Sequence, residues 1–277
     1  MAVALEKIAK PPCKLRKLLK RFPAHPSPDA VHALRTQSRR LEAVIDAVEP
    51  ERGKQSRRIL KLIKPMRKAA GAVRDMDVLI ENVIALSRDD AREALVGLVK
   101  YLAKMREKHT RRLLKIVARR RKEVRSLLRR YAAVLEKRSK ASSHGLMEDG
   151  SAPLILTTQL GFWPKLDAEN LHPFRVQVKK LRYMLQVAGH PGGSQMNALE
   201  DVKDTVGEWH DWSGLLKVAE KVLDSKADGA VLKQIEGIRE KKFRLALSSA
   251  KSLRRQDLEH LAKVSPGKLS RRKRKGQ

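Results

Sequence analysis

Two short segments with the same residue types and spacing hold the side chains best suited to chemistry. The first runs from His32 to Leu41 (HALRTQSRRL) and the second from His172 to Leu181 (HPFRVQVKKL), 140 residues later. In a helix, the histidine and the cations three and seven residues after it lie within about 60° of arc. Imidazole, guanidinium and ammonium groups on one face donate charge-assisted hydrogen bonds to anionic oxygens. Each segment therefore predicts an anion-binding stripe.

A second pair of matching blocks follows the first pair in the same order. Residues 71–75 (GAVRD) match residues 207–211 (GEWHD) at an offset of 136, and Arg67 matches Lys203 at the same offset. Two blocks repeated in order predict a duplicated four-helix unit. A solvated face has no reason to keep the same register twice, so the duplication favours function. If a pseudo-twofold axis relates the halves, the two stripes face each other and line one groove or pore.

Metal chemistry and catalysis are not favoured by these blocks. His210 and Asp211 could supply two metal ligands, but the first repeat has Arg74 at the histidine position, and no His and Asp cluster with ligand spacing accompanies them. We predict no metal, no cofactor and no catalytic residue. Asp75 and Asp211 are interpreted as residues near helix N-termini or as anchors that orient arginine side chains.

The charge of the chain points to an anionic partner. Among 277 residues, 62 are Lys or Arg and 31 are Asp or Glu, a net charge of +31. Such an excess favours binding to a polyanion, namely nucleic acid, an acidic membrane surface or a polymeric phosphate. Aromatic residues make up only 4% and do not alternate with basic residues. This disfavours single-stranded nucleic acid, whose bases stack on aromatic rings.

The remaining composition predicts a soluble, cytoplasmic protein. Hydrophobic residues make up 42% of the chain, enough to form a core despite the charge. The single Cys13 excludes an intramolecular disulfide and any zinc module built on cysteine pairs. The chain has neither an apolar run of eighteen residues nor a segment typical of a signal peptide, so we expect no integral membrane association.

Helical periodicity dominates the chain. Apolar spacing predicts helices over 27–49, 51–70, 73–86 and 89–138, and over 171–188, 195–206, 209–225 and 227–252. Ser27 is a candidate N-cap before Pro28. The longest helix has 17 cations and three acids between Lys100 and Lys140, which predicts a secondary basic surface for polyanions. That surface consists of Arg111, Arg112, Arg119, Arg120, Arg121 and Lys122.

Breaks in periodicity divide the chain into five parts. We expect a basic helical extension over 1–24 and a first four-helix half over 25–138. A connecting segment covers 139–169, and a second four-helix half covers 170–252. A short helix and a disordered basic tail follow over 253–277.

The ordered blocks together resemble the conserved histidine α-helical domain (CHAD) family over about residues 25 to 250. The resemblance rests on His-x-x-Arg-x-x-x-Arg-Arg-Leu from His32, on Gly-x-x-Arg-Asp-x-Asp-Val-Leu from Gly71, and on the second histidine motif, which ends in Leu-Arg-Tyr at Tyr183. It implies two antiparallel four-helix bundles that enclose a basic cavity for inorganic polyphosphate, often at polyphosphate granules. The chain lacks the Glu-x-Glu-x-Lys signature of the triphosphatase domain that some relatives carry, so it resembles a stand-alone member.

The sequence thus predicts an all-α protein with duplicated antiparallel four-helix bundles, related by a pseudo-twofold axis, and one long basic helix. We expect non-catalytic polyphosphate binding, with affinity that rises as histidines are protonated. The expected ligand-binding residues are His32, Arg35, Arg39, Arg40, Arg67, Arg74, His172, Arg175, Lys179, Lys180, Arg182, Lys203 and His210. The alternatives are a general polyanion or nucleic-acid-binding protein and, third, an accessory protein or enzyme of phosphate metabolism.

Overall fold

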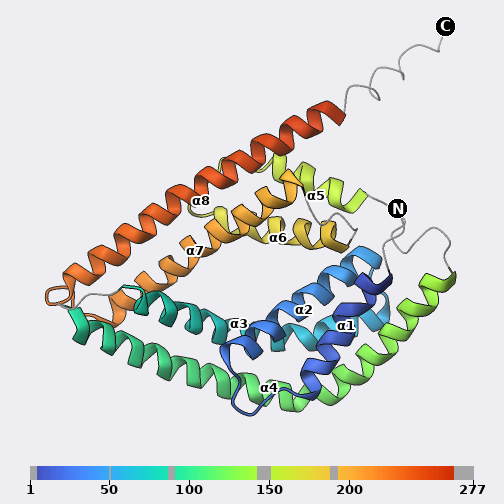
Figure 1. Ribbon diagram of the computed structural model, residues 1–277, viewed down its shortest axis with the longest axis horizontal. Helices are drawn as coiled ribbons and strands as arrows, with labels where there is room; N and C mark the ends of the chain where they lie inside the picture. Colours follow the sequence, from blue (N-terminus) through green and yellow to red (C-terminus); the bar gives the residue numbers. More distant parts are fainter. Residues whose placement is uncertain (1–4, 50, 87–90, 142–150, 188–192, 265–277) are drawn as a thin grey trace, which may run out of the picture.

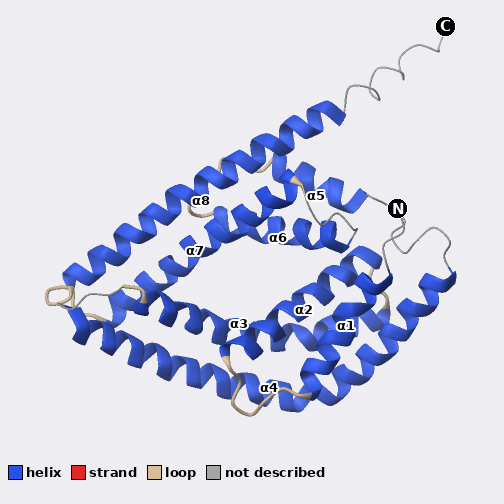
Figure 2. Cartoon of the chain, in the orientation of Figure 1, coloured by secondary structure: helices blue, strands red, loops and turns tan. Residues whose placement is uncertain are grey.

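The computed structural model describes residues 5–49, 51–86, 91–141, 151–187 and 193–264. Within these ranges the regular structure is entirely helical, which confirms the predicted all-α class (Figures 1 and 2). The helices are α1 (Leu5–Lys20), α2 (Pro28–Val48), α3 (Lys54–Ile84), α4 (Arg92–Ala141), α5 (Ser151–Gly161), α6 (Leu171–Val187), α7 (Ser194–Val222) and α8 (Gly229–Val264). None of these helices is both long enough and apolar enough to cross a bilayer.

The helices form two four-helix groups. In the first, α1 packs against α2 and α4, and α3 packs against α2 and α4. One buried core joins these four helices, with Leu15, Leu34, Ile63 and Leu128 among its members. In the second, α6 and α8 pack against both α5 and α7 around a separate core that includes Phe174. The pseudo-twofold relation between the groups stays a prediction.

A third core joins the two groups at one end of the molecule. It combines the end of α3, the start of α4, the end of α7 and the start of α8, where Leu79, Leu98, Trp212 and Ile235 are buried together. Figure 1 shows these helix ends meeting at the left end of the molecule. The third core therefore fixes α3 against α7, the two helices that carry the Gly-x-x-x-Asp blocks.

The fourth helix of each group differs from the sequence prediction. The helices predicted over 51–70 and 73–86 are replaced by the single helix α3, and those predicted over 195–206 and 209–225 by the single helix α7. The fourth helices are instead α1, predicted as an extension, and α5, predicted as part of the 139–169 connection. The reason in α5 is its nearly uniform apolar sequence, which shows no helical period, and a proline that falls in its first turn, where proline is tolerated.

The boundaries of α2 and α4 follow the predicted pattern. Ser27 caps α2 by accepting a hydrogen bond from the Ala30 amide at 3.2 Å, and Pro28 is the first helical residue. The long helix α4 is continuous and bends near its middle along the first group (Figure 1). Residues 253–264 continue α8, and the predicted tail over 265–277 lies outside the described residues.

Candidate anion-binding groove

Four helices bring the repeated segments together. The helix α2 contacts α6, and α3 contacts α7, so the two histidine motifs and the two glycine blocks border the middle of the molecule (Figure 1). Leu34 and Leu41 are fully buried in the first core. Their burial turns the cations of the same helix toward the second group. Phe174 and Val178 orient α6 in the same way.

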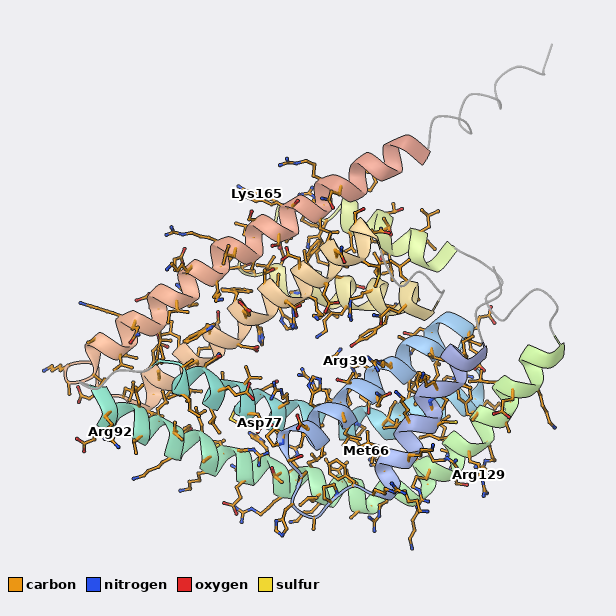
Figure 3. The ribbon with its side chains drawn as sticks, viewed as in Figure 1. Arg39, Met66, Asp77, Arg92, Arg129 and Lys165 are labelled. Carbon is orange, nitrogen blue, oxygen red and sulfur yellow. The ribbon has the colours of Figure 1, made fainter. Side chains whose placement is uncertain are left out.

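Cations from α2 and α6 converge in this space. Burial and then the nearby charges of Arg175, Arg39 and Arg35 lower the pKa of Lys179 to about 7. Burial also lowers the pKa of Arg39 and that of Arg175, with Arg35 adding to the effect in both cases. We call the space between Arg35, Arg39, Arg175 and Lys179 the central groove. Figure 3 shows Arg39 at its α2 side.

Three of the four groove cations lack a carboxylate partner within the described part of the chain. Arg35 approaches Asp75 with 3.8 Å between guanidinium nitrogen and carboxylate oxygen. Arg39, Arg175 and Lys179 have no such partner at ion-pair distance, and the buried Nε of Arg39 has no hydrogen-bond partner. Arg175 Nε donates to the Lys203 carbonyl at 2.7 Å. The groove therefore holds positive charge that is available to an anionic ligand.

The repeated glycines make room for the arginines. Gly207 lies beside the Arg175 guanidinium, and a Cβ there would overlap its terminal nitrogen and lie 3.1 Å from Cζ. Gly71 lies beside Arg35 in the same way but less tightly, since a Cβ would be 3.6 Å from Nε. Both glycines lie inside helices, where glycine costs about 1 kcal/mol relative to alanine. Close approach of Arg175 accounts for that cost at Gly207, whereas at Gly71 a Cβ would make only ordinary contact with Arg35.

The two repeated aspartates also lie inside helices, at the groove. Asp75 is in the middle of α3 and Asp211 in the middle of α7, so the interpretation as helix N-terminal residues is wrong. Burial raises the pKa of Asp75, Arg35 opposes this, and Asp211 adds to the rise. The Asp75 side chain is 56% exposed. The contact with Arg35 fits the alternative role as an anchor.

The histidines flank the cations, and the pKa values of His32 and His172 are lowered. The rings of His172 and His210 lie 4.3 Å apart between centroids. Burial, His210 and Arg175 lower the pKa of His172 to about 4. Burial and Arg74 lower the pKa of His32, whose Nε2 lies 3.3 Å from the Thr36 hydroxyl. In the free protein, His32 and His172 therefore become protonated only at acidic pH.

Four of the predicted ligand-binding cations are held in ion pairs. Arg67 binds Glu42 at 3.1 Å, and Arg74 binds Glu81 at 3.0 Å. Arg182 and Lys203 both bind Glu200, which links α6 to α7. The pairs of Arg67 and Arg182 join neighbouring helices, whereas those of Arg74 and Lys203 lie within one helix. All four cations are less available to a ligand than Arg39, Arg175 and Lys179.

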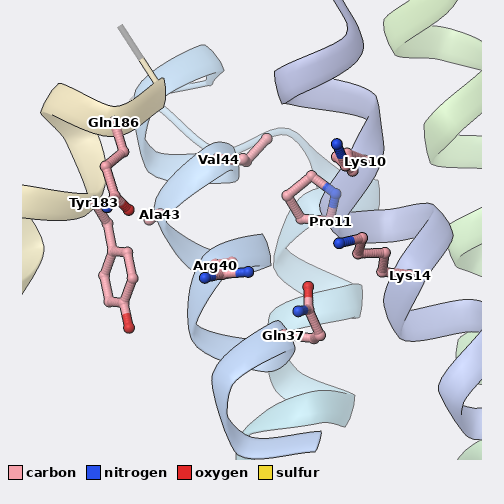
Figure 4. A pocket seen from close by; sticks show the side chains of 9 residues that line it. All are labelled: Lys10, Pro11, Lys14, Gln37, Arg40, Ala43, Val44, Tyr183 and Gln186. Atoms are coloured by element: carbon pink, nitrogen blue, oxygen red, sulfur yellow. The ribbon is translucent and has the colours of Figure 1, made fainter. Parts of the chain in front are cut away.

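One cavity adjoins the Arg39 end of the groove, and a second cavity shares Tyr183 with it. One, of about 230 Å³, is lined by Arg39, Lys179 and Lys180, with Tyr183 at its edge. The other, of about 290 Å³, lies between α1, α2 and α6 and is lined by Arg40 and Tyr183 among others (Figure 4). Tyr183 borders both cavities but was not predicted as a site residue. The available signal was its place at the end of the second histidine motif.

The predicted secondary basic surface lies on α4, apart from the groove. Arg111 is 68% exposed and approaches Glu107 at 3.8 Å. Arg112, Arg119, Arg121 and Lys122 are exposed, and Arg120 is half-buried. Most of this surface thus faces solvent, as a surface for polyanions requires.

Comparison with known proteins agrees with this architecture. The model of the CHAD domain family matches residues 14–220. PptA from Streptomyces chartreusis is similar in structure with a TM-score of 0.65 at 13% identity, covering 92% of this chain and 97% of PptA. The CHAD domain from the plant Ricinus communis gives a TM-score of 0.58 at 18% identity, covering 92% of this chain and 87% of that domain. No curated protein sequence matches the chain.

Proposed function

The chain belongs to the CHAD family, and on this premise we propose that its central groove binds inorganic polyphosphate without catalysing a reaction on it. The observation that supports this best is the convergence of Arg35 and Arg39 from one half with Arg175 and Lys179 from the other. Each half supplies cations at helical spacing, and a flexible chain of phosphates can contact both rows at once.

The chemistry of the groove suits phosphate oxygens. A guanidinium donates in a planar fork that matches two phosphate oxygens, and an ammonium adds a compact positive charge. Asp75 holds Arg35 from the side at 3.8 Å, which limits the directions in which that guanidinium can point. Guanidinium groups donate hydrogen bonds but do not accept them. We therefore assign these residues to binding and orienting the phosphate groups rather than to catalysis. We further propose that the protein is cytoplasmic and associates with polyphosphate granules through the same groove.

Competition tests this assignment against the nucleic-acid alternative. Labelled long-chain polyphosphate is bound to the full chain and challenged with unlabelled polyphosphate or with duplex DNA at equal phosphate concentration. We expect polyphosphate to displace the label and DNA to displace much less of it, because α2 contacts α6 and α3 contacts α7 while duplex DNA is roughly 20 Å wide. Equal displacement by DNA would refute the groove assignment and leave a general polyanion-binding protein.

The Gly207→Ala variant should lose affinity for polyphosphate without losing stability. The added methyl group must displace the Arg175 guanidinium, while alanine favours the helix by about 1 kcal/mol. Loss of one charge-assisted contact of about 1.5–3 kcal/mol corresponds to a tenfold or larger fall in affinity. Gly71→Ala should have a smaller effect, since its Cβ would make ordinary contact with Arg35. Calorimetric titration and thermal melting measure both quantities.

The matched control for Gly207→Ala is Gly237→Ala on α8. Apart from its chain neighbours and the backbone of its own helix, no described atom lies within 4 Å of the Cβ that this substitution would add. It therefore changes helix propensity alone and should leave affinity unchanged. If both variants weaken binding equally, or if Gly207→Ala binds like the natural protein, the close approach of Arg175 is not needed for binding.

Affinity for polyphosphate should fall as the pH rises above about 7. The pKa of Lys179 is about 7 in the free protein, and a bound polyanion favours the ammonium form, so it raises that pKa. Below pH 7 the lysine is charged in both states. Above pH 7 binding must take up a proton, which lowers affinity by up to tenfold per pH unit. The histidines, with pKa lowered, add their effect only at more acidic pH.

The Lys179→Arg variant separates this titration from other effects of pH. A guanidinium stays charged throughout the range, so the variant should bind with a flatter profile between about pH 6.5 and about pH 8.5. Titration in buffers of different ionisation enthalpy measures the proton uptake directly. An equal slope in the natural protein and in Lys179→Arg would exclude Lys179 as its source.

A further inference from the structure

A second basic site lies in a cleft between α1 and α4, two helices that carry none of the central-groove cations. The two helices pack side by side along the first group (Figure 1). Two cavities of about 250 and 380 Å³ adjoin there, and both are lined by Arg16 and Arg125. We call this the α1–α4 cleft. Its lining consists of Arg16, Lys17, Lys20, Arg21, Lys122, Arg125, Ser126 and Arg129.

Among the described residues, no carboxylate balances the positive charge of the α1–α4 cleft. Glu123 is the only acid of α4 between Arg111 and Arg130, and it binds Arg58 of α3 at 2.6 Å. None of the seven cleft cations is in a described ion pair. The Nε of Arg125 is buried and has no hydrogen-bond partner among the residues that the structure describes. In the central groove, by comparison, Asp75 and Asp211 offset part of the charge.

Stabilisation of the helix explains only a minority of these cations. Lys17 and Lys20 lie in the last turn of α1, where positive charge interacts favourably with the helix dipole. Arg125 and Arg129 lie well inside α4, so this argument does not apply to them. Cations that face each other across two helices repel unless an anion lies between them. The α1–α4 cleft is thus built for a ligand of several negative charges.

The lining also defines the chemistry of that ligand. Guanidinium forks from both helices match phosphate oxygens. The lining contains neither an aromatic side chain on which a base could stack nor an apolar residue to hold an acyl chain. The volumes lie near the lower end of ligand cavities, roughly 300–1,000 Å³. We propose that the α1–α4 cleft is a second, independent site that binds closely spaced phosphate groups, supplied by a free oligophosphate or by a segment of a polyphosphate chain.

Calorimetric titration of the full chain with inorganic tripolyphosphate tests the proposal. Arg16→Gln/Arg129→Gln removes two cleft charges without reversing them, and Arg119→Gln/Arg121→Gln removes two exposed charges of α4 outside the cleft. Arg39→Gln/Lys179→Gln disables the central groove. We expect the groove variant to retain a tripolyphosphate site that the cleft substitutions weaken at least tenfold, while the α4 control stays unchanged. Melting curves check that each variant folds.

The outcomes separate the cleft from the groove and one phosphate source from the other. Equal weakening by the cleft and control variants would overturn the proposal, since net charge alone would explain it. So would complete loss of both tripolyphosphate and long-chain polyphosphate binding in the groove variant. If the cleft variant binds tripolyphosphate normally but long-chain polyphosphate at least tenfold more weakly, while the control does not, the cleft binds a chain segment rather than a free oligophosphate.

Discussion

Replacing Arg175 and Lys179 with glutamate is expected to lower the affinity for long-chain polyphosphate by about a hundredfold or more. Each residue supplies a charge-assisted contact of about 1.5–3 kcal/mol, and a carboxylate in its place repels the ligand. The reversal of Arg35 and Arg39 should have an effect of similar size, because the four cations lie close enough to affect one another's pKa. Titration calorimetry or fluorescence anisotropy measures the loss.

Control variants with the same change of charge show whether position matters. Lys233 and Lys241 are exposed on α8, and their reversal changes the net charge by the same amount as either groove double variant. We expect that control to bind within a few-fold of the natural protein, since distant surface charges are screened beyond about 10 Å. All three proteins should keep their helical circular dichroism. If all three weaken binding alike, total charge rather than the groove determines affinity.

Polyphosphate should remain bound at about 0.5 M salt, where duplex DNA is released. Every polyanion loses affinity steeply with salt because binding releases condensed counterions, so the slope alone does not separate the ligands. The residual affinity does separate them. Contacts with Arg39, Arg175 and Lys179 are partly buried and are screened less than contacts at the surface of α4. Duplex DNA can reach only that surface.

Binding isotherms of both ligands over a range of salt concentrations provide the measurement. The groove variant Arg175→Glu/Lys179→Glu serves as the control, since its polyphosphate binding should become as salt-sensitive as that of DNA. If the natural protein lost affinity for both ligands in parallel, with no difference at any salt concentration, enclosure in a groove would make no contribution to polyphosphate affinity.

Much of the groove was predictable because the chain repeats itself. The shared register of Arg35 with Arg175 and of Arg39 with Lys179 indicated one site built from two halves, and the structure brings these four side chains together. The repeat also marked Gly71 and Gly207, but their contribution needs three-dimensional packing. Sequence spacing does not show that the Arg175 guanidinium of α6 lies beside Gly207 of α7.

The two helices that complete the four-helix groups were predicted least well, for different reasons. The helix α5 is apolar on most sides and shows no helical period. The helix α1 is amphipathic despite its two prolines, but it was expected as an extension, because its sequence does not show that its apolar face packs into the first core. Helix boundaries were predicted near Gly71 and Gly207 because glycine weakens an isolated helix. The helices α3 and α7 instead continue through these residues. Packing against neighbouring helices decides both cases. The α1–α4 cleft could not be predicted for a related reason, because its residues come from two helices that lie far apart in the sequence.

The location of bound phosphate tests the central claim most directly. A crystal structure of the full chain with a short polyphosphate of defined length would give it. The account predicts phosphate groups in the central groove, within hydrogen-bond distance of cations from both α2 and α6, with Arg175 still beside Gly207. Phosphate bound only at the α1–α4 cleft or on the exposed face of α4, with the groove empty, would contradict it.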